Sequence, residues 1–328
     1  MNTRIRRILV AIKDPTHAPP AQLRKAATLA RASGATLDLF HAIAEPEISH
    51  EVHRANGHET SGMAIESIGM HASHRLEHLA QSNLLRDVRI VTTPSWDYPP
   101  FEALIRHALR TRADLIVAAV QPERLAGRWV LANTDWELIR HSPVPVLIVK
   151  SPGDYNGAPI VAAIDPFHAH AKPSGLDKRI LGASKTFARM LKGKVHAFHA
   201  YMPLVLVAPG PAGMALTLPP EIEEVHSRQV ETQFARVSDR AGIPPSRRHL
   251  HMGIVKDELC AAIRDVRAGI VVMGAVSRSA LRRAFIGNTA ETVLDGLSCD
   301  VLVVKPAGFK TQIRLRATRR APSHLSLV

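Results

Sequence analysis

Short runs of apolar residues alternate along the chain with longer stretches in which apolar residues recur at helical spacing. The short runs are continuous, as in parallel strands buried on both faces of a sheet. The first half predicts strands at 6–12, 36–43, 87–93, 114–120 and 145–150, with helices at 20–33, 61–84, 99–112 and 132–141. The second half predicts strands at 159–164, 194–200, 247–252, 269–276 and 300–305, with helices at 175–191, 220–241, 256–267 and 287–297. This order predicts the α/β class, with doubly wound parallel sheets of five strands joined by right-handed crossovers.

The two halves are copies of one unit. Residues 117–150 fall without a gap on 272–305 at a shift of 155, and Asn133-Thr134 falls on Asn288-Thr289. Further upstream, 28–42 matches 186–200 at a shift of 158, and 10–14 matches 161–165 at a shift of 151. Nearly equal shifts in the same order indicate a tandem duplication. We therefore expect domains at 1–150 and 159–307, a turn-rich linker at 151–158 and a basic tail at 308–328 that is disordered.

Composition narrows the classes of protein that the chain can belong to. Its 328 residues, 46% of them hydrophobic, suffice for two domain cores. No run of 18 or more uncharged apolar residues occurs, and no long apolar stretch follows the N-terminal arginines. Neither a membrane span nor a secretory signal is therefore expected. The two cysteines, Cys260 and Cys299, fit a reducing compartment such as the cytoplasm.

The net charge of +13 raises the question of nucleic-acid binding. Much of the excess lies at the chain ends, in the sequence RIRR at 4–7 and in the tail. Basic tails bind any polyanion weakly, so we expect no specific nucleic-acid partner.

Three segments carry a resemblance to a known family. They are TDWELIRHSPVPVLIVK at the end of the first copy, FIGNTAETVLDGLSCDVLVVKP at the end of the second, and SWDYPPFEALI after the third strand. The chain resembles the tandem universal stress proteins of the UspA-like family, most closely the two-domain E type of proteobacteria. The resemblance covers about residues 4–306 and leaves the tail outside.

This resemblance implies a Rossmann-like fold related to the adenine-nucleotide alpha hydrolases. It also implies that the last strand of each copy pairs with its counterpart, which makes the chain an internal pseudo-dimer. Pairing would protect apolar strand edges that are otherwise prone to aggregation. Assembly into homo-oligomers is left open. The fold implies little about chemistry, because different sites occur on one scaffold.

ATP-binding members of the family carry the pattern G-x2-G-x9-G-[ST] after the fourth strand. Backbone amides of such a loop, with the following helix N-terminus, stabilise phosphate charge. The second copy keeps the spacing in Gly274, Ser277 and Gly287, but Ser277 replaces a glycine and Asn288 replaces Ser/Thr. Ser277 could donate its hydroxyl to a phosphate, whereas Asn288 could instead be a helix N-cap. A purely structural alternative is that Gly274 and Gly287 only allow tight turns.

The resemblance also assigns residues around this loop. Asp165 matches the family aspartate that approaches the adenine, and Ala200 matches the position that lines the adenine slot. The candidate nucleotide-binding residues are Asp165, Ala200, Met273, Gly274, Ser277, Arg278, Gly287, Asn288 and Thr289, and the implied ligand is ATP or AMP.

The first copy lacks the phosphate loop. Its corresponding residues are Ala119, Pro122 and Ala132, and proline has no amide to offer a phosphate. Asp14 persists as the counterpart of Asp165. The first half is therefore expected to be a packing partner or to hold something other than a nucleotide.

Histidine is frequent, with 18 residues. His71, His74 and His78 have helical spacing and could form a metal-binding face, but no cysteine or carboxylate cluster completes a ligand set, so solvated histidines are the favoured interpretation. His41 and His199 occupy equivalent strand positions, which indicates a structural role. No serine lies in a nucleophile-elbow context, and no catalytic set is expected.

These observations leave three functional hypotheses. The first is a cytoplasmic stress-response binding protein without turnover, which holds a nucleotide or another small ligand in its second domain. The second is a weak ATPase or nucleotidyl-transfer enzyme, for which Asp165 is the evident metal-positioning carboxylate. The third is a polyanion-binding protein that uses its basic termini.

Overall fold

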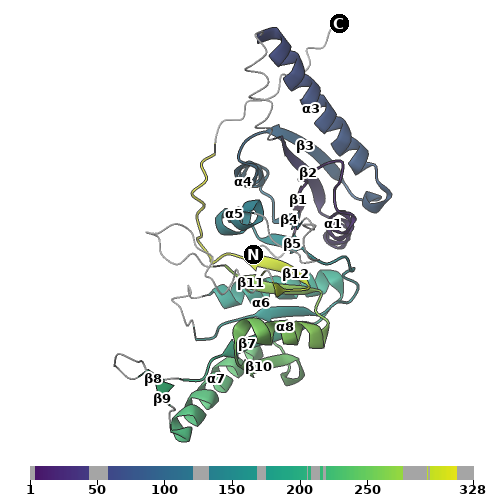
Figure 1. Ribbon diagram of the computed structural model, residues 1–328. Helices are drawn as coiled ribbons and strands as arrows, with labels where there is room; N and C mark the ends of the chain where they lie inside the picture. Colours follow the sequence, from purple (N-terminus) through teal and green to yellow (C-terminus); the bar gives the residue numbers. More distant parts are fainter. Residues whose placement is uncertain are drawn as a thin grey trace.

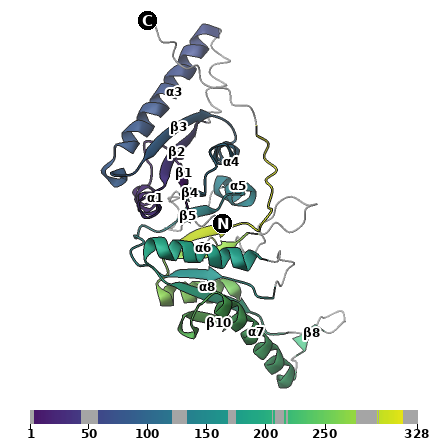
Figure 2. The ribbon, with the colours of Figure 1, turned by 180° about the vertical axis from the view of Figure 1, so that it is seen from behind.

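The computed structural model describes residues 4–43, 58–120, 133–167, 175–204, 206–207, 215–216, 219–275, 294 and 296–315. Within them the chain forms an elongated α/β molecule with one domain at each end (Figure 1). The view from behind shows the same arrangement, with α3 (His58–Ala80) and α7 (Pro220–Arg240) at opposite ends (Figure 2).

The elements follow the predicted order in both halves. The first domain contains β1 (Arg7–Ala11), α1 (Pro20–Ser33), β2 (Thr36–Ile43), α3, the 3-10 helix η1 (Asn83–Leu85), β3 (Ile90–Trp96), α4 (Pro100–Thr111), β4 (Leu115–Ala119), α5 (Asn133–His141) and β5 (Val146–Val149). The second contains β6 (Ile160–Ala163), α6 (Leu176–Leu191), β7 (Val195–Tyr201), β8 (Leu206–Val207), β9 (Ala215–Leu216), α7, η2 (Pro245–Arg247), β10 (Arg248–Met252), α8 (Val255–Val266), β11 (Ile270–Gly274) and β12 (Asp300–Val304).

The two domains share one ten-stranded sheet. Its strand order is β10-β7-β6-β11-β12-β5-β4-β1-β2-β3. All neighbours are parallel except β12 and β5, which are antiparallel, with Leu302 opposite Leu147. The predicted pairing of the two closing strands is therefore confirmed, and each domain contributes five parallel strands.

Successive strand residues point to opposite faces of this sheet, and each face has its own core. Val10, Leu147 and Leu302 lie in the core beneath α1 and α6. Leu9 and Val301 lie in the core beneath α4, α5 and α8. Figure 1 shows α1 on the opposite side of the first-domain sheet from α4 and α5. Each core runs without interruption across the join between β5 and β12, so burial as well as hydrogen bonding holds the halves together.

The structure departs from the predicted elements in a few places. The helix predicted at 61–84 begins at His58 and ends at Ala80, followed by η1. The antiparallel pair of β8 and β9 was not predicted, because two-residue strands leave no periodic pattern. Of the helix predicted at 287–297, only Leu294, Gly296 and Leu297 are described, and the first two are helical.

The basic tail is described as far as residue 315. Residues 308–315 contain neither helix nor strand. Ile313 packs against the core on the side of α4, α5 and α8. Both ribbon views show this segment running beside α5 and α4, so the tail returns to the first domain (Figures 1 and 2). The remainder of the tail lies outside the described residues.

Candidate functional site

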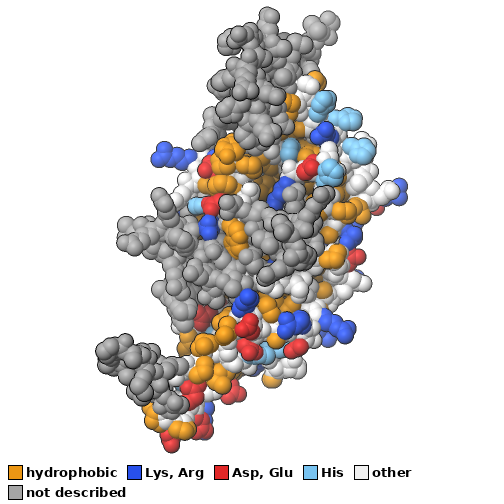
Figure 3. Space-filling view, viewed as in Figure 1, with side chains coloured by type: hydrophobic (Ala, Val, Ile, Leu, Met, Phe, Trp, Pro, Cys, Tyr) orange, Lys and Arg blue, Asp and Glu red, His pale blue; other side chains and the backbone are white. Residues whose placement is uncertain are grey.

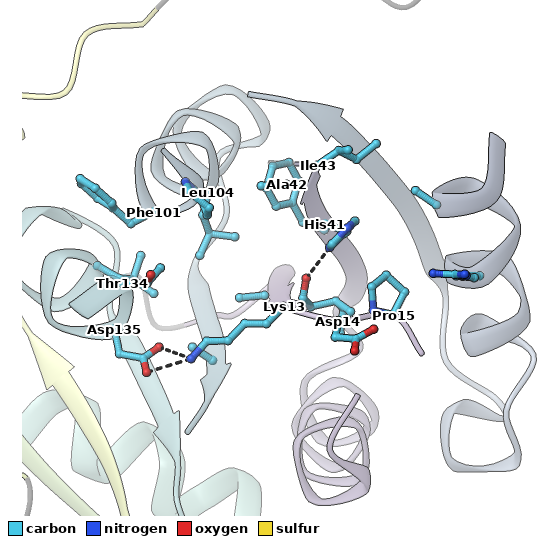
Figure 4. Close-up of a pocket in the computed structure, with 18 of the residues that line it drawn as sticks. Lys13, Asp14, Pro15, His41, Ala42, Ile43, Phe101, Leu104, Thr134 and Asp135 are labelled. Carbon is cyan, nitrogen blue, oxygen red and sulfur yellow. Dashed lines mark hydrogen bonds and ion pairs between the residues drawn. The ribbon is translucent and has the colours of Figure 1, made fainter. Parts of the chain in front are cut away.

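A cavity of about 680 Å³ lies in the first domain, at the carboxyl ends of β1, β2 and β4. Helices α3, α4 and α5 supply the rest of its walls (Figure 4). The carboxyl edge of a parallel sheet is the usual place for a ligand in α/β folds. The sequence predicted no defined ligand for this half, because its loop lacks the phosphate-binding glycines.

Most of the wall is apolar. Phe40 comes from β2, Leu104 and Phe101 from α4, Ala118 from β4 and Leu138 from α5. All except Phe101 are at most 5% exposed, so the wall belongs to the packed core beneath α4 and α5. In Figure 4, the side chain of Leu104 extends from α4 toward the cavity, and Phe101 stands on the same helix at its margin. Ligands with apolar groups bind such walls through the hydrophobic effect.

An ion-pair cluster fixes the start of α4, the helix that carries the wall residues Phe101 and Leu104. The Arg106 side chain is 1% exposed and donates to both oxygens of Asp97, at 2.8 and 2.5 Å, and to Glu102 at 2.6 Å. Burial alone would lower the pKa of Arg106, but the bonds to Asp97 and Glu102 outweigh it and raise the pKa. The segment SWDYPPFEALI that carried the family resemblance therefore has a physical role, since it positions Phe101 and Leu104.

Lys13 and Asp135 form a charged pair at the floor of the cavity. The Lys13 ammonium lies 2.8 and 2.9 Å from the two Asp135 oxygens. Asp135 stands in the first turn of α5 and is almost completely buried. Lys13 follows β1 and reaches across to α5 (Figure 4).

Asp14 lies beside Lys13 but is held by its own loop. One oxygen accepts from the Thr16 amide at 2.8 Å and from its hydroxyl at 2.5 Å, and the other contacts His17 Nδ1 at 2.9 Å. Burial alone would raise the pKa of Asp14, but these bonds from Thr16 and His17 outweigh it and lower the pKa to about 2. Asp14 is therefore ionised at neutral pH and already has donors.

His41 also lines the cavity, and a hydrogen bond to the backbone fixes the orientation of its ring. Its Nδ1 donates to the carbonyl of Ile12 at 2.9 Å, and His199 donates in the same way to Ile164 at 3.0 Å. The two equivalent histidines thus make the same contact in both domains, in agreement with the structural role predicted for them.

In the second domain the structure describes four of the nine candidate nucleotide-binding residues. Asp165, Ala200, Met273 and Gly274 follow or end strands at the carboxyl edge of the sheet. The other five, Ser277, Arg278, Gly287, Asn288 and Thr289, lie outside the described residues. Ala200 is buried against the core, while Met273 is half-buried.

Gly274 has a packing explanation. A Cβ built at this position would lie 2.6 Å from a terminal methyl carbon of Leu176 in α6. Its φ is not in the left-handed region, so conformational freedom is not what the position requires. Close approach of α6 to β11 therefore accounts for this glycine without any ligand.

Asp165 has a different character. Its backbone amide donates to Asp177 at 3.1 Å. Its own Oδ1 is buried, and no donor reaches it among the residues that the structure describes. A buried acceptor without a donor is costly, so this atom is suited to a group that arrives with a ligand.

The histidines predicted to share a helix face do not gather at one point. His71 lines the cavity, and all three of His71, His74 and His78 are exposed on α3. Figure 3 shows histidine side chains along the outer side of that helix. Over the described part of the chain, no three His, Cys, Asp or Glu side chains are grouped as metal ligands would be. Over the same part, no helix is both long and apolar enough to span a membrane.

Comparison with known proteins agrees with the duplicated architecture. Residues 4–150 and 159–305 each match the universal stress protein family. Universal stress protein E of Escherichia coli strain K12 is 27% identical over 318 residues, which cover 94% of this chain and 96% of that protein. Universal stress protein E of Photorhabdus laumondii is 25% identical over 312 residues, covering 93% and 97%.

Among solved structures, a functionally unknown protein from Pseudomonas aeruginosa PAO1 has a TM-score of 0.70. Its sequence is 23% identical to this one, and the match covers 93% of this chain and 94% of that chain. At this identity, the likeness shows the fold alone. Both halves match one family, and the relatives match over nearly the whole chain. The chain therefore belongs to the universal stress protein family, as a tandem member similar to the proteins named universal stress protein E.

Proposed function

We propose that this protein is a ligand-binding protein of the stress response, and that the first-domain cavity holds a small organic molecule without converting it. The cavity itself is the observation that supports this most. Its volume of about 680 Å³ suits a molecule of drug or metabolite size. Its wall is mainly apolar, with a few polar groups whose positions are fixed by Asp135, Thr16 and Ile12.

The fixed geometry of the wall favours binding. Phe101 and Leu104 stand on a helix whose start is held by the buried Arg106 cluster. Phe40, Ala118 and Leu138 belong to the core itself. A preorganised wall loses little conformational entropy when a ligand enters.

Mass spectrometry of what the protein retains tests this proposal. Ala42 lines the cavity and is half-buried, so Ala42→Phe should fill space that a ligand needs. Ala80 is half-buried in α3 and does not line the cavity, so Ala80→Phe is the matched control. Protein purified under native conditions is expected to carry a small molecule in the wild type and in Ala80→Phe, and to lose it in Ala42→Phe. Retention by Ala42→Phe, or no molecule in any of the three, would contradict the proposal.

A second candidate function is nucleotide binding in the second domain. The buried Asp165 Oδ1 without a described donor favours it, since an adenine amino group could supply that donor. ATP or AMP should then raise the melting temperature of the wild type, and Asp165→Ala should abolish the increase. No increase with either nucleotide would rule this candidate out.

Turnover and polyanion binding are tested in the same preparations. A weak ATPase that depends on Asp165 should lose hydrolysis in Asp165→Ala. Binding through the basic tail should disappear when 309–328 are deleted and should weaken steeply with salt.

The cellular role follows from the family as a further proposal. We infer action in the cytoplasm during starvation, oxidative or DNA-damaging stress, where the free thiols of Cys260 and Cys299 would remain reduced. Cells lacking the gene should survive such stress less well. Complementation with Ala42→Phe should then restore survival less than complementation with Ala80→Phe.

A further inference from the structure

We propose that Asp135 determines which ligands the first-domain cavity accepts. By neutralising Lys13, it disfavours phosphates and other anions and reserves the cavity for uncharged, largely apolar molecules. This inference rests on the proposed binding function and adds the chemical class of the ligand.

The charged pair stands where an anion would otherwise bind. A helix N-terminus attracts negative charge, and an ammonium group beside it adds to that attraction. Asp135 lies in the first turn of α5, and its two oxygens are 2.8 and 2.9 Å from Lys13 Nζ. The Asp135 carboxylate thus already occupies the position at which the N-terminus of α5 and the Lys13 ammonium would attract an anion. Only 2% of the Asp135 side chain and 26% of the Lys13 side chain are exposed, so water screens this pair weakly.

The pair occurs in one copy of the duplicated unit. At the shift of 151, Lys13 corresponds to Ile164, and at the shift of 155, Asp135 corresponds to Ala290. Both members of the pair are therefore replaced by uncharged residues in the copy that keeps the phosphate-loop spacing. In the copy with the pair, the loop positions are Ala119, Pro122 and Ala132.

The other described charges of the cavity do not restore anion binding. Among the described residues, its wall contains two cationic ones, Lys13 and Arg75, and two acidic ones, Asp14 and Asp135, whose formal charges cancel. Arg75 is exposed on α3, where solvent weakens its attraction for an anion. Asp14 has its own donors in Thr16 and His17. An entering anion would therefore be desolvated beside Asp135 without gaining a buried cation of its own among the described residues.

Two probes that share one apolar body test the inference. N-phenyl-1-naphthylamine is uncharged, and 8-anilinonaphthalene-1-sulfonate adds a single sulfonate. Fluorescence titration of the full chain gives the affinity of each. Only binding that Ala42→Phe removes and Ala80→Phe retains is assigned to the cavity. The wild type is expected to prefer the uncharged probe by about tenfold or more, the value of one charge-assisted hydrogen bond.

Asp135→Asn should release Lys13 and raise the affinity for the sulfonate by about tenfold, with little change for the uncharged probe. Asp154→Asn is the control, because that exposed carboxylate pairs with Arg24 away from the cavity. A wild type that binds the sulfonate as tightly as the uncharged probe overturns the inference whether or not Asp135→Asn folds. A folded Asp135→Asn variant also overturns the inference if its ratio of affinities for the two probes equals that of the wild type. If the uncharged probe shows no binding that Ala42→Phe removes, the proposed binding function fails as well.

Discussion

The side-chain nitrogen of Lys25 lies 2.6 Å from a carboxylate oxygen of Asp300, although 275 residues separate the two in the chain. Lys25 belongs to α1 and Asp300 begins β12, and both side chains are buried. The other Asp300 oxygen accepts from the amides of Lys150 and Ser151, each at 2.9 Å. Burial, reinforced by the charge of Asp300, raises the pKa of Tyr155 well above its usual value, so its hydroxyl stays protonated and donates to Asp300. Asp300 thus joins the first helix and the linker to the last strand.

Removing the charge of Asp300 should destabilise the whole chain. Asp300→Asn leaves the Lys25 ammonium buried without a counter-ion, which should lower the free energy of unfolding by about 3–5 kcal/mol. Urea unfolding followed by circular dichroism measures this. Asp154→Asn is the matched control, since its pair with Arg24 is solvent-exposed and should contribute less than about 1 kcal/mol. Equal small losses in both variants would contradict a structural role for the buried pair.

The ion pairs at the start of α4 should support both stability and binding. Arg106→Met leaves Asp97 and Glu102 without their buried partner and should cost about 2–4 kcal/mol of unfolding free energy. The same variant should also bind the uncharged naphthylamine probe more weakly, because the positions of Phe101 and Leu104 in the cavity wall depend on the position of α4. Arg228→Met, which removes an exposed pair with Glu224, should change neither measurement appreciably.

Packing at Gly274 predicts a coupled pair of substitutions. Gly274→Ala places a methyl group against Leu176 and should cost about 1–3 kcal/mol of unfolding free energy through overpacking. Leu176→Ala alone should cost about 2–5 kcal/mol, because it leaves a cavity in the core. The double variant should cost less than the sum of the two. Strict additivity would show that the glycine is needed for something other than this contact.

Two histidines near the edge of the sheet predict how stability depends on pH. His196 Nδ1 on β7 lies 2.9 Å from His249 Nε2 on β10. Burial, followed by repulsion from His249, Arg247 and Lys194, lowers the pKa of His196 to about 4. The pKa of His249 is lowered by burial and then by His251.

An unfolded histidine titrates near its ordinary pKa of about 6.5. Between that pH and about 4, the unfolded chain therefore binds more protons at these positions than the folded chain. Their contribution to stability is complete above about pH 6.5 and is lost as the pH falls through this window. His196→Gln should flatten the dependence of unfolding free energy on pH between 7 and 4.5.

The strands followed from the sequence because they depend on local patterns. Continuous apolar runs predicted the parallel strands, whereas the family resemblance implied that the closing strands meet, as Leu147 and Leu302 do. The site was harder to predict, because its wall combines segments far apart in the chain. Phe40, Leu104 and Leu138 each read as ordinary core residues.

Gly274 illustrates the opposite difficulty. Its spacing from Ser277 and Gly287 suggested a phosphate loop, yet its contact with Leu176 supplies a sufficient structural reason. The pair of Lys25 and Asp300 has no counterpart in a repeat or a motif, so no pattern in the sequence could reveal it. Interactions that occur in only one copy of a duplicated fold can be identified only from the three-dimensional structure.

A crystal structure of the full chain soaked with N-phenyl-1-naphthylamine tests the central claim most directly. We expect density for the probe in the first-domain cavity, in contact with Phe40, Leu104 and Leu138, with the ion pair between Lys13 and Asp135 intact. Crystals that bind the probe elsewhere but show no density for it in this cavity would contradict the account. So would a structure in which the bound probe has separated Lys13 from Asp135.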